Sequence, residues 1–552
     1  MVLRLDVRAY GGESMELLPI YDKAAAERPP KFVKLLDQSK CIGCHACTTA
    51  CKSENEVPLS VSRTYVKSVD VGEFPQVRRN FQVTRCNQCE DAPCVNACPT
   101  GAMFQRDDGI VDFDKLDCIG CKACIASCPY DAIFINPEDN SAEKCNFCAH
   151  RLDVGLEPAC VVVCPVEAIL VGDINDSSSR VAQEIGRSST QVRRPEKDTR
   201  PKVHYKGASQ HTLDPLAAMR PDSEAADILA WSQQKPEDGH TINSGTPVDP
   251  LDQRDRPHAA LGEGHPGNSS AAALLSYDVG HSVPWDWRVG LYTWTKSIAA
   301  GAYLVVATLV LLGLLDAGNA LWQWVAPLAG LTFLGVTGAV LIWDLEHPGR
   351  FYYIFTKGRW QSWLVKGAAI ITVYGAVLSA HLLASLFGGG SVQQVLTIIG
   401  IPAAAMTAVY TAFLFAQAKA RDLWQSPLLP PHFVVQAAVA GSAAAIPFAT
   451  AFAPEAVADL GIVLAGSVAV HLLMILGEMT LAHPTAHARV AAHNLRSGDL
   501  GRFFWGGVVL AAIGLLAPVS SGVALVAAPV ALAGLLAHEH AYVQAGQSVP
   551  LA

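Results

Sequence analysis

Apolar and polar positions divide the chain into two unlike parts. Before residue 177 the two kinds of residue alternate over short segments, whereas eight long apolar runs follow residue 284. Each run approaches or exceeds the roughly 20 residues that cross the hydrocarbon core of a membrane. The runs lie near 291–315, 322–344, 361–387, 395–418, 431–452, 457–481, 503–519 and 521–540. The pattern therefore predicts an all-α bundle of eight transmembrane helices over 284–552.

The segment between the two parts has a composition of its own. Residues 177–283 are rich in Pro, Asp, Ser, Gly, Arg and His and sustain no apolar period. Such a segment cannot form its own core, so an extended linker is expected, parts of which rest on neighbouring domains. Residues 1–34 are expected to form an N-terminal extension without a secretory apolar region.

Cysteine usage gives the N-terminal part its chemistry. All sixteen cysteines fall in four groups of four between residues 41 and 164. The groups are Cys41, Cys44, Cys47 and Cys51; Cys86, Cys89, Cys94 and Cys98; Cys118, Cys121, Cys124 and Cys128; and Cys145, Cys148, Cys160 and Cys164. Repeated two-residue spacings without a secretory segment indicate metal ligation in a reducing compartment rather than disulfides.

Groups one and three have the C-x2-C-x2-C-x3-C spacing of bacterial ferredoxins, in which the fourth thiolate binds a neighbouring [4Fe-4S] cluster. Pro99, Pro129 and Pro165 follow the last cysteines of groups two, three and four, and Lys52 follows the last cysteine of group one. Structural zinc also uses paired C-x2-C knuckles. It does not require these three-cysteine runs with every thiol accounted for, so four cubane clusters are the preferred interpretation.

Exchange of the fourth ligand requires the groups to pair in space. The repeat order suggests a pseudo-twofold duplication that pairs group two with three and group one with four. The predicted ligand sets are Cys41, Cys44, Cys47 and Cys164; Cys145, Cys148, Cys160 and Cys51; Cys86, Cys89, Cys94 and Cys128; and Cys118, Cys121, Cys124 and Cys98. The expected fold is an α+β ferredoxin-like duplicated iron–sulfur domain over 35–176, followed by the all-α membrane bundle.

The motifs CIGCHACTTAC, RCNQCEDAPCVNACPTGA, CIGCKACIASCPYDAI and KCNFCAHRLDVGLEPACVVVCPVEAI resemble the four-cluster iron–sulfur subunits of molybdopterin oxidoreductases, such as polysulfide, dimethyl sulfoxide and nitrate reductases. The resemblance covers roughly residues 35–175. It implies an electron-transfer subunit of a respiratory complex whose catalytic subunit, carrying a molybdenum or tungsten cofactor, is a separate polypeptide.

The membrane part resembles the polysulfide-reductase membrane subunits, also called NrfD-like, from about residue 283 onward. The motifs are VPWDWRVGLYTWTKSIAAGAYLV, DLEHPGRF and the terminal YVQAGQSVPLA. The resemblance implies eight or more spans, no haem and a quinone pocket close to the iron–sulfur partner. Menaquinone and ubiquinone both remain open.

Basic residues sort to one side of the eight predicted spans. The loops on that side carry Arg350, Lys357, Arg359, Lys419, Arg421, Arg489, Arg496 and Arg502, whereas the opposite loops have no Lys or Arg. The positive-inside rule places the basic loops, and with them the iron–sulfur domain, on the cytoplasmic side of the inner membrane.

Ionisable groups in a membrane are costly and are therefore functional candidates. Quinone chemistry needs hydrogen-bonding groups at each carbonyl and a route for two protons. Asp344 and His347 are the first choice, with Tyr292 and Lys296 next. Tyr410 and Glu478 complete the candidate quinone set. Mutual pairing among Asp344, Glu346 and Arg350 at the helix end is the structural alternative.

Three functional classes remain open at this stage. The preferred class is a relay between a catalytic subunit and membrane quinone; the others are a redox-driven proton-translocating module and an anchor without a quinone reaction. His381, His471 and Glu478 are candidates for a proton path, although packing within the bundle is the preferred explanation for them. The net charge of −9 gives no indication of nucleic-acid binding. Sulfite, formate, polysulfide, thiosulfate and arsenite all remain possible substrates of the partner.

Overall fold

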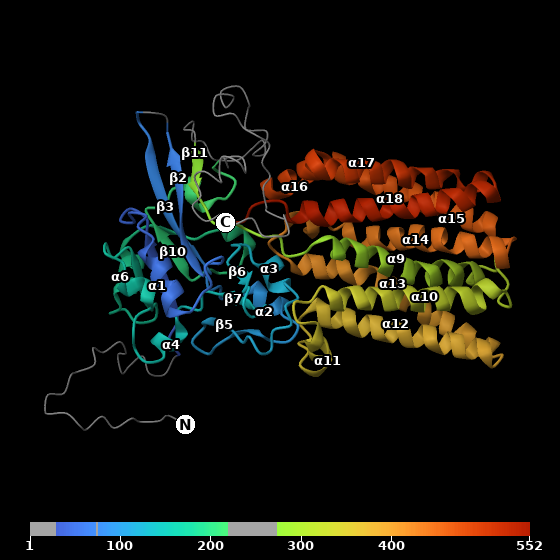
Figure 1. Cartoon of the computed structure of the whole chain (residues 1–552), viewed down its shortest axis with the longest axis horizontal. Coiled ribbons are helices and arrows are strands. Elements are labelled where there is room, and N and C mark those ends of the chain that lie inside the picture. Colours follow the sequence, from blue (N-terminus) through green and yellow to red (C-terminus); the bar gives the residue numbers. More distant parts are fainter. Residues whose placement is uncertain (1–28, 73–74, 219–272) are drawn as a thin grey trace.

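The computed structural model describes residues 29–72, 75–218 and 273–552. An iron–sulfur part built of short strands and helices stands against one end of a long helical bundle (Figure 1). The C-terminus lies where the two parts meet. This two-part architecture confirms the predicted fold class.

Four small sheets organise the iron–sulfur part. A four-stranded sheet has the order β8-β1-β10-β9 and a three-stranded sheet the order β11-β2-β3, while β4 pairs with β5 and β6 with β7. The strands are β1 Phe32–Asp37, β2 Thr64–Val71, β3 Arg78–Arg85, β4 Met103–Gln105, β5 Val111–Phe113, β6 Ile133–Ile135, β7 Ala142–Lys144, β8 Ile169–Asp173, β9 Thr190–Gln191, β10 Val203–Lys206 and β11 Ala273–Tyr277. β1 is an interior strand, paired with β8 on one side and β10 on the other, and all six of its residues are buried.

Short helices follow the cysteine motifs. They are α1 Ala46–Glu54, α2 Pro93–Ala97, α3 Ala123–Ser127, α4 Ala149–Leu152 and α5 Ala159–Val162, with α6 Arg180–Arg187 and α7 Gln210–Leu213 further along. The loops before α1 and α3 repeat one geometry. Gly43 and Gly120 both have φ +69°, and His45 and Lys122 both have φ 60°. A conformation this rare for residues with a side chain, found twice, fits a duplicated domain.

The expected linker is partly folded, so the boundary at residue 176 is too early. β10 pairs in parallel with β1, and β11 pairs antiparallel with β2. Both strands come from the segment without apolar periodicity, because strands of four or five residues that complete an existing sheet need no long apolar run. Residues 219–272 of that segment, and most of the predicted N-terminal extension, lie outside the described residues.

Eight helices in the described part of the chain are long and apolar enough to cross a membrane, as predicted. They are α9 Trp287–Leu311; a π-helical turn with α10 over Leu321–Trp343; α12 Trp363–Leu386; α13 Gly390–Gln417; α14 Leu429–Phe452; α15 Ala456–Thr480; α17 with a 3₁₀ extension over Gly498–Val519; and α18 Ser521–Gln547. Two shorter helices, α11 Tyr353–Thr356 and α16 Ala486–Arg496, lie in loops that face the iron–sulfur part.

Helix α9 is the core of the bundle and packs against α10, α13, α14 and α18. Its contact with α14 is backbone to backbone, because a Cβ added at Gly301 would overlap the carbonyl oxygen of Ala437. Small residues permit such close approach between membrane helices. Side chains that project from α9 therefore enter the interior of the bundle rather than lipid.

Basic loops of the bundle hold the iron–sulfur part. Lys357 pairs with Asp117 at 2.5 Å, and the Arg350 guanidinium donates to the carbonyl oxygen of Cys118 at 2.8 Å. The backbone N–H of Arg359 donates to the carbonyl of Pro99 at 2.8 Å. The iron–sulfur part and these basic loops therefore lie on the same side of the bundle.

Candidate functional site

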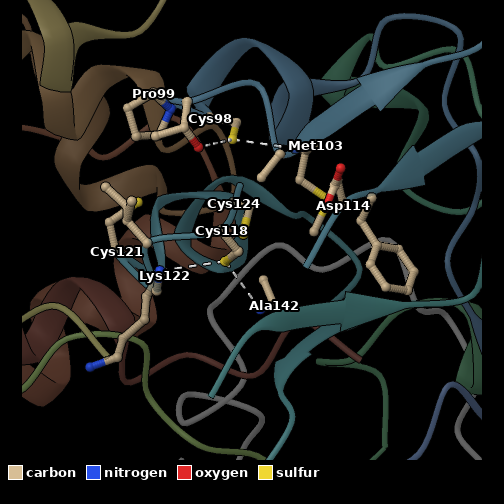
Figure 2. Close-up of a pocket in the computed structure, with 14 residues that line it drawn as sticks. Cys98, Pro99, Met103, Asp114, Cys118, Cys121, Lys122, Cys124 and Ala142 are labelled. Atoms are coloured by element: carbon tan, nitrogen blue, oxygen red, sulfur yellow. Dashed lines mark hydrogen bonds between the residues drawn. The ribbon is translucent and has the colours of Figure 1, made fainter. Parts of the chain in front are cut away.

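Four thiols from two cysteine groups surround a hollow next to the membrane bundle (Figure 2). Cys98, Cys118, Cys121 and Cys124 line this space of about 360 Å³. Cys98 comes from the end of α2, and the others come from the loop before α3 and from α3 itself. The hollow therefore brings thiols of groups two and three together.

The other thiols gather in the same exchanged manner. Cys41, Cys44, Cys47 and Cys164 line a hollow of about 320 Å³. Cys51 lies within electrostatic reach of Cys145, Cys148 and Cys160, and Cys128 within reach of Cys86 and Cys89. These neighbours include pairs from every predicted ligand set, but Cys160 also acts on Cys47 and Cys94 on Cys124, so the four ligand sets stay a prediction. In the described ranges no three His, Cys, Asp or Glu side chains have the spacing that would hold one metal ion.

The surroundings of the thiols suit a negatively charged group. Backbone N–H groups donate to sulfur at Cys98, from Met103 at 3.3 Å, and at Cys164, from Ala168 at 3.3 Å. Burial acts to raise the pKa of Cys160, yet the charges of Lys34 and Arg85 lower it to about 7. Thiolates stabilised by N–H donors and buried cations are what iron–sulfur ligation requires. The residues present therefore fit [4Fe-4S] clusters.

The membrane loop that carries Asp344 docks on the cysteine loop of group three. The backbone N–H of His347 donates to the carbonyl of Ile119 at 3.2 Å, and Glu346 pairs with Lys122 at 2.7 Å. A Cβ added at Gly120 would overlap that of Glu346, so only glycine permits this approach. The loop thus binds the iron–sulfur part, and the alternative of mutual pairing among Asp344, Glu346 and Arg350 does not describe it.

Asp344 itself is buried between cations of both parts. Its carboxylate lies 3.4 Å from the Arg288 guanidinium and 3.9 Å from the Lys122 ammonium. Burial raises the pKa of Asp344 to about 6, against the opposing effect of these two charges. Nε2 of His347 is buried without a hydrogen-bond partner. Both side chains therefore remain available to hydrogen-bond a ligand beside the group-three loop.

A second group of predicted residues meets inside the bundle. The Lys296 ammonium, fully buried on α9, donates to the carbonyl of Ala408 at 2.7 Å and to the hydroxyl of Thr411 at 2.8 Å. It lies 5.2 Å from the ring centroid of Tyr410, which is also buried. Tyr292, one turn before Lys296, belongs to the apolar cluster that includes Trp285 and Phe415.

Glu478 lies apart from these residues. It is on α15, which packs against α14 and α18, and its Oε1 is buried without a hydrogen-bond partner. The docking loop and the interior around Lys296 are not separate in this way, because Tyr292 lies within electrostatic reach of both Asp344 and Tyr410.

Sequence reasoning missed a polar cavity between α9, α14 and α18. It measures about 280 Å³ and is lined by Thr293, His432, Gln436, His538 and Glu539 together with apolar residues. Glu539 accepts a hydrogen bond from the Thr293 hydroxyl at 2.7 Å, and its charge interacts with that of Lys296. The signal was present, because the segment HEH stands inside the eighth apolar run.

The histidines named from sequence belong to two separate networks. His471 accepts or donates a hydrogen bond at 2.8 Å with His432, and its ring lies 5.0 Å from that of His538. His381 instead contacts the Tyr303 hydroxyl at 3.2 Å and packs edge-on against Trp322. His381 and His471 thus have no partner in common among these contacts.

Buried arginines at the junction of the two parts bind the C-terminal segment of the chain. The Arg421 guanidinium donates to the carbonyls of Gln547 and Val549 at 3.2 and 3.3 Å, and that of Arg193 to the carbonyl of Leu551 at 3.1 Å. Burial lowers the pKa of Arg421 to about 10, although Asp131 opposes this. Trp285 stacks on Trp424 and donates to the carbonyl of Cys121 at 3.3 Å. Sequence reasoning did not identify this buried junction.

Comparison with known families agrees with this division. Residues 77–174 match the 4Fe-4S dicluster domain family, and residues 277–551 match the polysulphide reductase NrfD family. The two matches fall on the two parts of the structure and leave the segment between them unmatched.

Several curated relatives match the iron–sulfur part. The chain is 44% identical over 190 residues to a subunit of the tetrathionate reductase of Salmonella typhimurium, covering 34% of this chain and 76% of that protein. It is 44% identical to protein NrfC of Escherichia coli, over 30% of this chain and 77% of the relative. One component of the polysulfide reductase of Wolinella succinogenes is 41% identical over 31% of this chain and 92% of its own length. The chain therefore belongs to the family of iron–sulfur electron-transfer subunits of reductase complexes, here fused to an NrfD-type multi-pass membrane anchor.

Proposed function

We propose that this chain relays electrons through four [4Fe-4S] clusters between a molybdopterin-bearing catalytic subunit and membrane quinone. The observation that carries the proposal is the docking of the Asp344–Arg350 loop on the cysteine loop of group three. It brings buried ionisable side chains of the membrane part next to a set of four thiols. Bound clusters would supply one-electron chemistry, whereas quinone exchanges two electrons and two protons.

The chain's own residues would bind and orient the quinone. Asp344 and His347 can hydrogen-bond a quinone carbonyl, and Asp344 can accept a proton in its ionised form. Lys296 and Tyr410 offer further donors deeper in the bundle. The relatives' names, which specify tetrathionate and polysulfide reductases, support a separate catalytic partner.

We place the iron–sulfur part on the cytoplasmic side of the inner membrane. The bias of Lys and Arg toward the loops next to it supports this orientation. Several of those basic residues also bind the iron–sulfur part directly, among them Arg350 and Lys357. An accessibility assay on cysteines introduced in the opposite loops, at Gly388 and Ser520, tests the orientation.

Replacing Asp344 with asparagine tests the quinone reaction. A quinol analogue is expected to reduce the clusters of the purified wild-type complex, seen by low-temperature EPR, and Asp344→Asn to slow this about a hundredfold or more, the loss typical of a missing general base. Because the Asp344 carboxylate has a pKa of about 6, the wild-type rate should fall as the pH decreases through 6. The variant should lose this pH dependence.

Glu455→Gln is the control, because this carboxylate lies just before α15 in a loop on the opposite side of the bundle, where it accepts a hydrogen bond from Asn319 at 2.7 Å. It should keep the wild-type pH profile. If quinol never reduces the clusters, oxidation of pre-reduced clusters by quinone is measured next. If neither reaction occurs, the quinone reaction is contradicted and the chain is a membrane anchor without a quinone reaction.

A second candidate function, proton translocation, is favoured by the polar cavity around Glu539. Orphaned buried polar atoms line it, including Oε1 of Glu539, both ring nitrogens of His538 and Oε1 of Gln436. Buried polar groups without protein partners are commonly satisfied by water, and a hydrated chain can carry protons. The cavity lies between Lys296 and the His432–His471 pair.

Proteoliposomes containing the complex would test proton translocation. Glu539→Gln is expected to lower the number of protons translocated per electron at least twofold while cluster reduction by quinol continues. His381→Ala serves as the comparison, because His381 belongs to the separate Tyr303 network. An unchanged number of protons translocated per electron in Glu539→Gln would contradict this function.

A further inference from the structure

Two buried cations of the iron–sulfur part face a single thiol. Lys34 lies in the central strand β1, and Arg85 ends β3; their exposed fractions are 0% and 1%. The Lys34 ammonium is 3.8 Å from Sγ of Cys160, and Nη1 of Arg85 is 3.2 Å from the same atom. Two positive charges thus converge on one member of the set Cys51, Cys145, Cys148 and Cys160.

Neither cation has a carboxylate partner among the described residues. Lys34 otherwise lies 4.4 Å over the ring of Phe147, and Nε and Nη2 of Arg85 have no hydrogen-bond partner. A nearby contrast is Arg63, whose guanidinium pairs with Glu143 at 2.6 Å. Because unpaired buried charge is costly, Lys34 and Arg85 require a negative group at the thiols.

We propose that Lys34 and Arg85 raise the reduction potential of the cluster held by Cys51, Cys145, Cys148 and Cys160, and so make it the place in the relay where an electron is held most stably. The inference rests on the proposed clusters. Reduction adds one electron and therefore one negative charge, which nearby uncompensated cations stabilise in a medium of low dielectric constant. Net charge and hydrogen bonds to sulfur are established determinants of cluster potential.

The other ligand sets lack this arrangement. Two cations, Lys144 and Lys202, act on Cys86. Lys144 donates to the backbone carbonyls of Val111 and Cys145, and the carboxylates of Asp108 and Glu90 offset the charge of Lys202. The Cys118 set meets charges of both signs, because Arg350 acts on Cys118 and Asp344 on Cys121. Arg85 also acts on Cys47, but Lys34 donates to Cys160. Uncompensated positive charge is therefore greatest at the Cys160 set.

An EPR-monitored redox titration of the intact purified complex tests the proposal. Lys34→Met is expected to lower the reduction equilibrium constant of one cluster at least tenfold, which is about 59 mV for one electron. The other three potentials should move much less. Lys34→Arg, which keeps the charge, should restore the wild-type value. Lys31→Met is the matched control, because Lys31 precedes the same strand but is partly exposed and paired with Glu90.

The affected signal is assigned with Cys160→Ser, which should perturb the same EPR component. Unchanged potentials in Lys34→Met, or an equal shift of all four, would overturn the proposal. Should Lys34→Met not assemble, Arg85→Lys keeps and Arg85→Gln removes the second charge; the largest shift is then expected at the Cys160 set and a smaller one at the Cys47 set, on which Arg85 also acts. The iron and sulfide content of the wild type tests the proposed clusters themselves. A content below four clusters would contradict the proposed function, whereas a full content with unchanged potentials in the variants would contradict only this inference.

Discussion

Lys296→Met is expected to reduce the rate of cluster reduction by quinol by about two to four orders of magnitude, the range for loss of a positioned proton-transfer group. Lys296 is fully buried and holds Thr411 and the Ala408 carbonyl. It also provides the positive charge that acts on Glu539. The measurement is stopped-flow absorbance of the clusters after mixing with a quinol analogue.

Two further variants separate function from folding. Lys296→Met removes the cation that acts on Glu539 and the two hydrogen bonds that Lys296 donates to Ala408 and Thr411, so the bundle should become less stable. The double variant Lys296→Met with Glu539→Gln removes both charges, so it should recover stability without recovering the rate. Lys366→Met is the matched control, because Lys366 lies over Trp363 at the start of α12. Recovery of the rate in the double variant would show that Lys296 acts only through stability.

Arg421→Gln is expected to destabilise the junction of the two parts by about 1–3 kcal/mol, the cost of leaving the buried carbonyls of Gln547 and Val549 without their donor. Arg421 is almost fully buried, donates to the carbonyls of Gln547 and Val549, and acts on Asp131 of the iron–sulfur part. Thermal unfolding in detergent, followed by cluster absorbance and by tryptophan fluorescence, measures the change.

The two probes should separate in Arg421→Gln, since a weakened junction lets one part unfold before the other. Arg502→Gln removes an exposed arginine that pairs with Asp499, and such surface pairs contribute about 0–1 kcal/mol. It should therefore resemble the wild type. Coincident transitions at the wild-type temperature in Arg421→Gln would contradict a structural role for this residue.

The sequence was sufficient for the eight spans and for the iron–sulfur nature of the first part, because apolar length and cysteine spacing are local properties. The two Cys-Ile-Gly-Cys loops have the same backbone angles at Gly43 and Gly120, as a repeat predicts. The strands β10 and β11 were missed, since their partners lie in β1 and β2, far away along the chain. Pairing between distant short segments leaves no periodic signal.

The candidate quinone residues were found as individual ionisable side chains, but their grouping required the structure. Asp344 and Lys296 lie on different elements whose distance apart no spacing rule gives. The basic bias at Arg350, Lys357 and Arg421 was interpreted as membrane orientation alone, whereas these side chains also bind the other part of the molecule. The distribution of Lys and Arg along the sequence shows which loops are basic, but it does not show which groups these side chains contact.

The central position of β1 bears on the order in which the first part can assemble. β1, at residues 32–37, is completed only by β8 and β10, which are synthesised much later. The thiols of groups two and three fall within residues 86–128, whereas groups one and four are separated by the whole span from 41 to 164. Contacts close in sequence form faster than distant ones, because less chain entropy is lost in closing the loop. The half of the domain nearest the membrane, which carries groups two and three, can therefore fold before β8 and β10 have completed the distal half. Cofactor insertion would then begin in the half nearest the membrane and end in the distal half.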